Sequence, residues 1–267
     1  MALSKSSRSK GISETVRTII YAVAIAIVVR TFLYEPFNIP SGSMKPTLLV
    51  GDYLFVSKFA YGYSRHSLPF SPPIGNGRLF GDLPERGDVA VFKLPSNNRT
   101  DYIKRIVGLP GDRIQVQEGV LYVNDQEVTR TEIEDFIDDG PAGRIACRSF
   151  AEGNGASAGI RRYEESIPSF ADAEDMATYT VLDECPDGNG DFDNTEVFTV
   201  PEDHVFAMGD NRDNSLDSRA KVGYVPIENL VGRAEIIFFS TNGSARLWEI
   251  WKWPITIRYG RLLNLID

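Results

Sequence analysis

An apolar run near the N-terminus constrains the fold more than any other feature of this sequence. It extends uncharged from Thr18 to Val29 and continues after Arg30 to Leu33, and residues 1–17 before it carry four basic residues and one acid. A cleaved signal peptide, a buried core helix and a membrane anchor all begin in this way. No small-residue cleavage site follows the run, and residues 19–29 offer almost no polar face for a core helix.

The anchor is therefore the favoured interpretation, although the 16 residues from Thr18 to Leu33 span only about 24 Å as a helix. Arg30 can reach the interface with its long side chain, and Tyr34 and Phe37 can lie there. We predict a cytoplasmic tail over residues 1–17 and one transmembrane helix over residues 18–35. The basic flank places the N-terminus in the cytoplasm and the rest of the chain outside the plasma membrane of a bacterium.

The charge of the chain is concentrated in one segment. The 267 residues carry a net charge of -9, but residues 118–200 hold 20 acidic residues against 5 arginines. We interpret 118–200 as an inserted, peripheral acidic β subdomain whose charges face solvent. It divides the core of the chain beyond the anchor into residues 36–117 and 201–267. No basic stripe with interleaved aromatic residues is present, so nucleic acid is not an expected partner.

Both cysteines, Cys147 and Cys185, lie in the acidic segment. Two interpretations stay open: a pair of unrelated thiols, or one disulfide, which an oxidising compartment outside the cytoplasm would preserve. No cysteine–histidine grouping indicates a metal site.

After residue 36 the pattern is that of a mainly β protein. Short runs rich in β-branched and aromatic residues are bounded by Gly, Pro, Asp or Asn, which is typical of strands. Pro110-Gly111 indicates a turn, because Gly accepts the positive φ that a type II turn requires. The runs lie at residues 53–56, 89–92, 102–107, 120–123 and 236–239.

Three stretches carry side chains suited to catalysis. Ser41-Gly42-Ser43 places two hydroxyls around a glycine that lets the backbone approach a substrate closely. In the run 102–107, alternation puts Tyr102, Lys104 and Ile106 on one face of a strand. Apolar surroundings favour the neutral form of Lys104, and a pKa about 2–3 units below ~10.4 would make it a base near pH 7–8. The third stretch, residues 209–219, is rich in Asp, Asn and Ser and reads as a loop.

Together these stretches resemble the type I signal peptidase family, which uses a Ser-Lys dyad. The similar segments are residues 37–62, 86–112 and 205–233. The resemblance implies a β-rich catalytic domain and a serine endopeptidase that cuts signal peptides from exported preproteins after small residues, as in Ala-x-Ala. The reaction of this family requires no cofactor and no metal, so none is expected here. Secretory preproteins and the lipid bilayer are the expected partners, and the protein is expected to act as a monomer.

The resemblance also implies roles for individual residues. Ser43 matches the nucleophile and Lys104 the general base, Ser41 a donor to the oxyanion hole, and Ser215 the hydroxyl that orients the lysine amine. Gly209, Asp217 and Arg219 match supporting positions, the last two as an ion pair. The shallow pockets for small substrate side chains correspond to Ile39, Pro40, Met44, Leu48, Tyr102 and Ile103.

Other functions compete with this one. A Ser-His-Asp triad would need His66 or His204, the only histidines. A self-cleaving repressor with a Ser-Lys pair would need an N-terminal DNA-binding helix pair, where this chain has its apolar run. A noncatalytic membrane-tethered binding module would lack the nucleophile or base, and both are present. All three tryptophans lie within residues 248–253, which suggests a second contact with the membrane interface.

Overall fold

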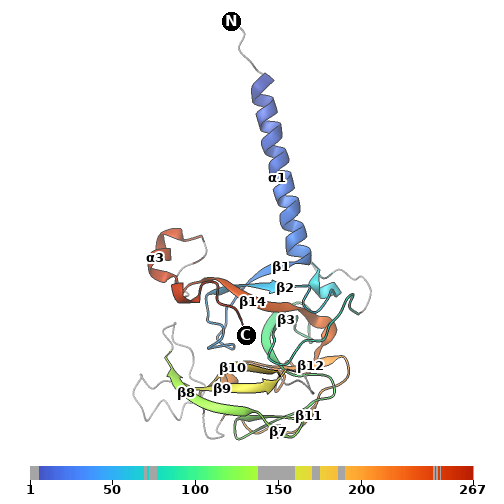
Figure 1. Cartoon of the computed structure of the whole chain (residues 1–267), viewed down its shortest axis with the longest axis vertical. Helices are drawn as coiled ribbons and strands as arrows, with labels where there is room; N and C mark the ends of the chain where they lie inside the picture. The colour runs from blue at the N-terminus through green and yellow to red at the C-terminus, as the bar shows by residue number, and fades with distance from the viewer. Residues whose placement is uncertain are drawn as a thin grey trace.

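The apolar N-terminal run forms helix α1 (Ser6–Phe32), which projects from one end of a body made of strands (Figure 1). The computed structural model describes residues 6–68, 71, 77–137, 160–169, 175–185, 190–242, 244, 246 and 248–266, and only the backbone of residues 6–13. Within α1, the 19 residues Glu14–Phe32 have a mean hydropathy of 1.7, are long and apolar enough to cross a membrane, and are not buried. The helix ends before the predicted boundary at residue 35, because Tyr34 and Glu35 already pair with a neighbouring strand.

A seven-stranded sheet forms the part of the body next to α1 (Figure 1). All of its pairings are antiparallel, and they join segments far apart in the chain. In spatial order its strands are β1 (Tyr34–Asn38), β2 (Asp52–Ser57), β14 (Leu230–Ser240), β3 (Val89–Lys93), β4 (Asp101–Gly108), β12 (His204–Met208) and β13 (Val225–Pro226).

Two smaller sheets lie at the end of the body away from α1 (Figure 1). One has the order β11 (Phe198–Thr199), β5 (Arg113–Gln117), β6 (Val120–Val123) and β7 (Gln126–Glu127). The other has the order β10 (Met176–Asp183), β9 (Ile160–Pro168) and β8 (Thr129–Phe136). Because β5 pairs with both β6 and β11, the second layer begins at Arg113, before the predicted insertion boundary at residue 118.

The remaining described elements are short. They are the 3-10 turns η1 (Arg65–Ser67), η2 (Arg212–Asn214), η3 (Ile227–Asn229), η4 (Ile250–Lys252) and η5 (Tyr259–Arg261), and the helix α3 (Trp253–Thr256). Between β4 and β5, Gly111 has φ 85° and the Asp112 N–H donates to the Leu109 carbonyl, which confirms the turn predicted at Pro110-Gly111. The mainly β fold with one N-terminal apolar helix is confirmed.

Buried apolar side chains hold the sheets together in three clusters. The cluster of Ile39, Met44, Leu48, Leu54 and Val56, with others, lies under the loop that follows β1. Burying one such side chain contributes about 1.5–3 kcal/mol relative to leaving it exposed. The core therefore fixes the apolar residues of this loop, while Ser41 is exposed and Ser43 is half-buried.

Candidate active site

Ser43 lies in the loop between β1 and β2. Two turns shape the loop: the Lys45 N–H donates to the Gly42 carbonyl at 3.1 Å, and the Leu48 N–H donates to the Met44 carbonyl at 2.8 Å. Met44 and Leu48 are buried in the core. Ser43 itself is half-buried, and Ser41 at the start of the loop is exposed.

The Lys104 side chain reaches Ser43 from strand β4. Its Nζ donates to Ser43 Oγ at 2.5 Å across 61 residues of sequence, and to the carbonyl of Ile103 at 3.1 Å. The amine lies 5.8 Å from the centre of the Tyr102 ring, which agrees with the predicted strand face shared by Tyr102 and Lys104. The chain thus brings a hydroxyl and an amine into the hydrogen-bonded contact that a nucleophile and its base require.

The environment of Lys104 favours its neutral form. Only 3% of the residue is exposed. Burial lowers the pKa of the Lys104 amine to about 8, while the negative charges of Asp217 and Asp210 oppose part of that shift. A substantial fraction of the amine is therefore unprotonated near pH 8 and able to accept a proton.

A buried ion pair joins strand β4 to the loop that follows β12. Thr47 contacts this pair from the loop between β1 and β2 (residues 39–51), called the nucleophile loop here for its predicted nucleophile Ser43. Arg105 Nε and Nη2 donate to the two oxygens of Asp210 at 2.9 and 2.8 Å, and both side chains are 1% exposed. Thr47 Oγ1 donates to the same carboxylate at 2.6 Å. Asn211 adds a contact to the nucleophile itself, because its backbone N–H donates to the Ser43 carbonyl at 3.1 Å.

Gly209, Ser215 and Asp217 pack behind the Ser–Lys pair. A side chain at position 209 would overlap both the Ser215 hydroxyl and the Ser43 carbonyl, so only Gly fits there. Asp217 accepts from Arg219 Nε at 3.0 Å and from the Gly209 N–H at 3.0 Å. Burial alone would raise the pKa of Asp217, but Arg219 and these hydrogen bonds hold that pKa below its usual value.

The sequence is similar to that of known peptidases over most of its length. Residues 12–239 match the family described as signal peptidase, peptidase S26. A signal peptidase I of Rickettsia conorii is 38% identical over 245 residues, covering 89% of this chain and 84% of that protein. The signal peptidase I of Rickettsia prowazekii is 38% identical over 238 residues, covering 88% and 83%. This chain belongs to the signal peptidase I family.

A solved structure from that family gives a weaker match. The crystal structure of a signal peptidase I from Enterococcus faecalis is 22% identical and covers 57% of this chain and 97% of that chain, with a TM-score of 0.29. That score is too low to add weight to the sequence relationship. Family membership makes the protein a membrane-bound serine endopeptidase that cleaves signal peptides, and it disfavours the noncatalytic binding module.

Neither histidine of this signal peptidase is needed to explain the contacts of Ser43. His66 is buried and its Nε2 accepts from Arg65 Nε at 3.1 Å. His204 Nδ1 lies 2.8 Å from the Glu202 carbonyl oxygen. Within the described residues, the side-chain partner of Ser43 Oγ is the Lys104 amine.

The six predicted substrate-binding residues do not all lie in one place. Ile39, Met44 and Leu48 belong to one buried cluster, against which the half-buried Ile103 packs. Tyr102 packs on a second cluster, and Pro40 is exposed beside Ser41. Their contact with substrate stays a prediction.

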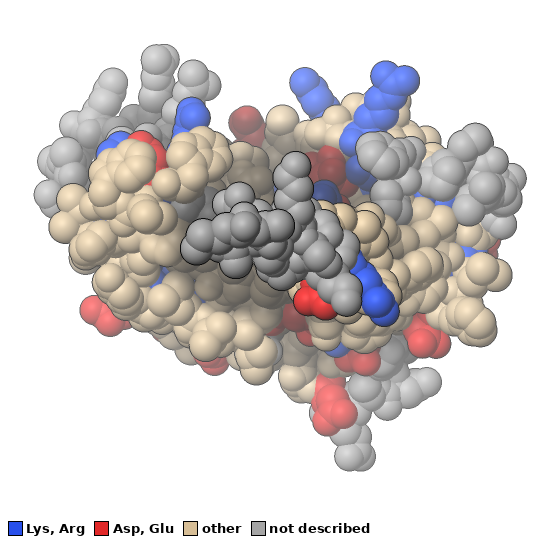
Figure 2. Space-filling view, turned by 90° about the horizontal axis from the view of Figure 1, so that it is seen from above, with Lys and Arg blue, Asp and Glu red and all other residues tan. Residues whose placement is uncertain are grey.

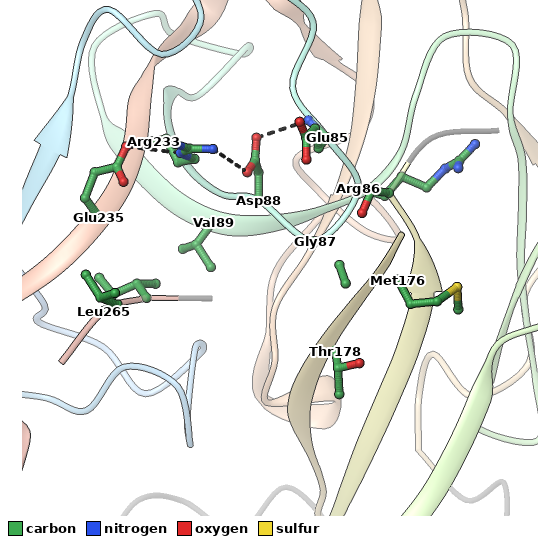
Figure 3. Close-up of a pocket in the computed structure, with 13 residues that line it drawn as sticks. Glu85, Arg86, Gly87, Asp88, Val89, Met176, Thr178, Arg233, Glu235 and Leu265 are labelled. Atoms are coloured by element: carbon green, nitrogen blue, oxygen red, sulfur yellow. Dashed lines mark hydrogen bonds and ion pairs between the residues drawn. The ribbon is translucent and has the colours of Figure 1, made fainter. Parts of the chain in front are cut away.

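Two hollows flank this arrangement. One of about 290 Å³ is lined from β1 and β4 by residues that include Phe37 and Asp101. Another of about 510 Å³ lies between the segment 85–89, β10 and the C-terminal residues (Figure 3). Neither Ser43 nor Lys104 is among the described residues that line the larger one, where Asp88 is held by Arg233 at 3.4 Å.

Sequence reasoning missed several residues of the site. Arg105, Asp210 and Thr47 form the buried link described above, and Asn211 holds the nucleophile loop. Arg105 directly precedes the apolar residues Ile106 and Val107 of β4, and a charged residue next to a buried run signals a buried partner. Among the residues described, no group of three or more potential ligands could hold a metal ion.

Of the two cysteines, only Cys185 is described. It is buried and disulfide-bonded, as the disulfide interpretation requires, whereas Cys147 lies outside the described residues.

Proposed function

We propose that this signal peptidase cuts its substrate through an acyl-enzyme on Ser43, with Lys104 as the general base. The neutral Lys104 amine takes the proton of Ser43 Oγ as that oxygen attacks the carbonyl carbon of the last signal-peptide residue. The tetrahedral intermediate collapses, the bond to the mature protein breaks, and the Lys104 ammonium returns the proton to the leaving amine. The 2.5 Å contact between Nζ and Oγ supports this assignment more than any other observation.

Deacylation uses the same two residues. The Lys104 amine takes one proton from a water molecule whose oxygen attacks the ester carbon. The bond from that carbon to Ser43 Oγ then breaks as Oγ receives the proton from Lys104, and the signal peptide leaves as a carboxylic acid that gives its remaining proton to solvent. The Ser43 N–H and the Ser41 hydroxyl are proposed to stabilise the oxyanion in both steps, and one such donor is typically worth about 3–4 kcal/mol. The Ser215 hydroxyl, packed behind Gly209, is proposed to orient the amine.

The substrate is proposed to bind as an added strand between β1 and β4. Among the described strands β1 pairs only with β2, and β12 pairs with β4 only from Arg105 onward. The backbone of Asp101–Lys104 is therefore open on that side, and an extended peptide can use its hydrogen-bonding groups. Ile39 and Met44 are buried in the core, and we propose that they form the floor of shallow pockets suited to small side chains such as Ala.

A secretory precursor ending its signal with Ala-x-Ala tests this proposal. The wild-type protein in detergent is expected to cut after the second Ala, and a precursor with Leu there is expected to be cut about 100-fold more slowly, because a larger side chain does not fit a shallow pocket. Mass spectrometry of the products locates the cut. Right-side-out membrane vesicles are expected to cut precursor added outside, and inverted vesicles to leave it intact, if residues 1–17 are cytoplasmic. Equal cleavage of both precursors would refute the pocket.

We also propose that the segment 248–256, which includes α3, contacts the lipid bilayer. It lies on the side of the body from which α1 emerges (Figure 1). On that face, broad uncharged areas lie on either side of the helix (Figure 2). Trp248 and Trp251 are 66% and 71% exposed, as expected for side chains that rest at a membrane interface. Trp253 differs, because its ring packs 4.9 Å from that of Phe239.

A chain that starts at Leu33 lacks α1 and isolates this contact. It is expected to bind phospholipid vesicles in a flotation assay, and W248A/W251A is expected to reduce the bound fraction several-fold, because each exposed indole loses its place at the interface. A variant with Tyr122, a residue of the distant strand β6, changed to Ala serves as the matched aromatic control. Vesicle binding that is equal in all three proteins would count against the contact.

A further inference from the structure

Asn211 holds the peptide group that precedes the nucleophile. Its Nδ2 donates to the Gly42 carbonyl at 3.3 Å, and its backbone N–H donates to the Ser43 carbonyl at 3.1 Å. Asn211 is 1% exposed, so water does not compete for these bonds. One residue of the loop after β12 therefore donates hydrogen bonds to two successive carbonyls of the nucleophile loop, and this pair of bonds is called the Asn211 grip.

The Asn211 amide and the Lys45 N–H, which donates to the same Gly42 carbonyl, together fix where the Ser43 N–H points. The Gly42 carbonyl and the Ser43 N–H belong to one planar trans peptide group and face opposite ways. When Asn211 holds the carbonyl on one side, the N–H is directed to the other side. That N–H is the backbone donor assigned above to the oxyanion, and its value depends on its direction before the reaction begins.

The acidic segment fixes the amide of Asn211 in turn. Glu184, which directly follows β10 and is 8% exposed, accepts from Asn211 Nδ2 at 2.9 Å through its Oε1. A carboxylate oxygen accepts hydrogen bonds and cannot donate them, so the NH₂ end of the amide must face Glu184 and, with it, the Gly42 carbonyl. Without this acceptor, the amide could turn its oxygen toward Gly42 and lose the grip.

Further hydrogen bonds hold the segment around Glu184 against the loop that follows β12. The Leu182 N–H donates to the Asp210 carbonyl at 2.8 Å, and the N–H groups of Glu184 and Cys185 donate to Asp213 Oδ2 at 2.7 and 2.9 Å. Nearby, Arg212 Nη1 donates to the buried Glu165 at 2.9 Å. Each residue from Asp210 to Asp213 therefore has a partner in β9, in β10 or just after β10.

We propose that Glu184 and Asn211 are positioning residues that direct the Ser43 N–H into the oxyanion hole, so that the acidic segment tunes catalysis. The proposal rests on the oxyanion role of the Ser43 N–H given under the proposed function. Neither side chain hydrogen-bonds the Lys104 amine within the described residues. Losing either one should therefore weaken transition-state stabilisation and leave the basicity of Lys104 in place.

The test compares Glu184→Ala, Glu184→Gln and Asn211→Ala in the full chain, with Ser43→Ala as the inactive reference. Loss of the Glu184 acceptor is expected to lower kcat about 10-fold, and loss of the Asn211 amide about 100-fold. Deleting an oxyanion donor outright lowers kcat by about 10²–10³, so the first effect is smaller than that range and the second lies at its lower end. Glu184→Gln keeps an oxygen that accepts from Asn211 and is expected to regain most of the loss. KM and the midpoint of the pH–rate profile should stay as in the wild type.

Binding of a peptide boronic acid gives a second readout, because its tetrahedral adduct on Ser43 places an oxygen where the oxyanion forms. The affinity is expected to fall by a factor similar to that in kcat. Glu164→Ala is the matched control, since Glu164 is exposed on β9 and carries the same charge. The proposal is overturned if Glu164→Ala loses as much activity, if Glu184→Ala keeps its kcat, or if the loss reflects only fewer active molecules by burst titration. Full activity of Ser43→Ala would instead overturn the proposed function.

Discussion

Ser43→Ala and Lys104→Ala are each expected to lower kcat/KM for an Ala-x-Ala precursor by on the order of 10⁴- to 10⁶-fold. In the proposed mechanism Ser43 Oγ forms the bond to the substrate, and the Lys104 amine at 2.5 Å is the group that removes its proton. Because the two residues act as one unit, the double variant should be no worse than the more damaging single one. Cleavage of a purified precursor in detergent measures the effect.

The pH dependence identifies the base independently. Lys104 acts while neutral, and its pKa is about 8, so kcat/KM should rise with pH and level off above a midpoint near 8. At pH 6 only about 1% of such an amine is neutral, which predicts a roughly 100-fold lower rate there. A histidine base would instead place the midpoint near its ordinary pKa of ~6.5.

Lys221→Ala is the matched control for the lysine, because Lys221 is exposed. Its activity should equal that of the wild type, and all variants should unfold at similar temperatures. Substantial cleavage by a folded Lys104→Ala protein would show that the base lies elsewhere, and His66 and His204 would be tested next.

Asp210→Asn is expected to destabilise the folded protein by about 3–5 kcal/mol. The substitution keeps the shape of the side chain but leaves the Arg105 guanidinium, itself 1% exposed, without its counter-charge. Thermal unfolding in detergent should begin roughly 6–20 °C lower, given about 2–4 °C per kcal/mol for a chain of this size. Activity should fall as well, since Asp210 also accepts from Thr47 of the nucleophile loop.

The exposed pair Arg113–Asp125 provides the comparison. Its side chains are 50% and 64% exposed, and such pairs typically contribute about 0–1 kcal/mol. Asp125→Asn should therefore leave the unfolding temperature almost unchanged. Equal shifts of the unfolding temperature for both substitutions would show that burial does not make the Arg105–Asp210 pair more important for stability.

Much of the fold could be read from local patterns. The five predicted β runs all lie within observed strands, because alternating β-branched and aromatic residues fit a half-buried sheet whatever their partners are. Local patterns did not predict which strands pair with one another. The edge strand β1 includes Tyr34 and Glu35, which the apolar run alone assigned to the anchor, because strand pairing with β2 outweighs their proximity to the helix.

Charge patterning was less informative. The acidic segment was expected to face solvent, yet Glu165 and Glu184 are buried against the loop after β12. A count of acidic residues does not distinguish a solvated carboxylate from one that has a buried donor, since the donors of Glu184 and Glu165 lie 27 and 47 positions away in the chain.

Local sequence patterns were enough to predict the apolar helix, the positions of the main strands, the turn at Pro110-Gly111 and the three stretches that carry Ser43, Lys104 and the loop 209–219. These depend on neighbours within a few residues, through side-chain periodicity and the conformational freedom of Gly and Pro. Three features follow from the three-dimensional arrangement instead: the approach of Lys104 to Ser43, the burial that lowers the pKa of that lysine, and the contacts by which Glu184 and Asn211 hold the nucleophile loop. Desolvation and hydrogen bonding depend on distances in space, and pairing across the sheets sets those distances.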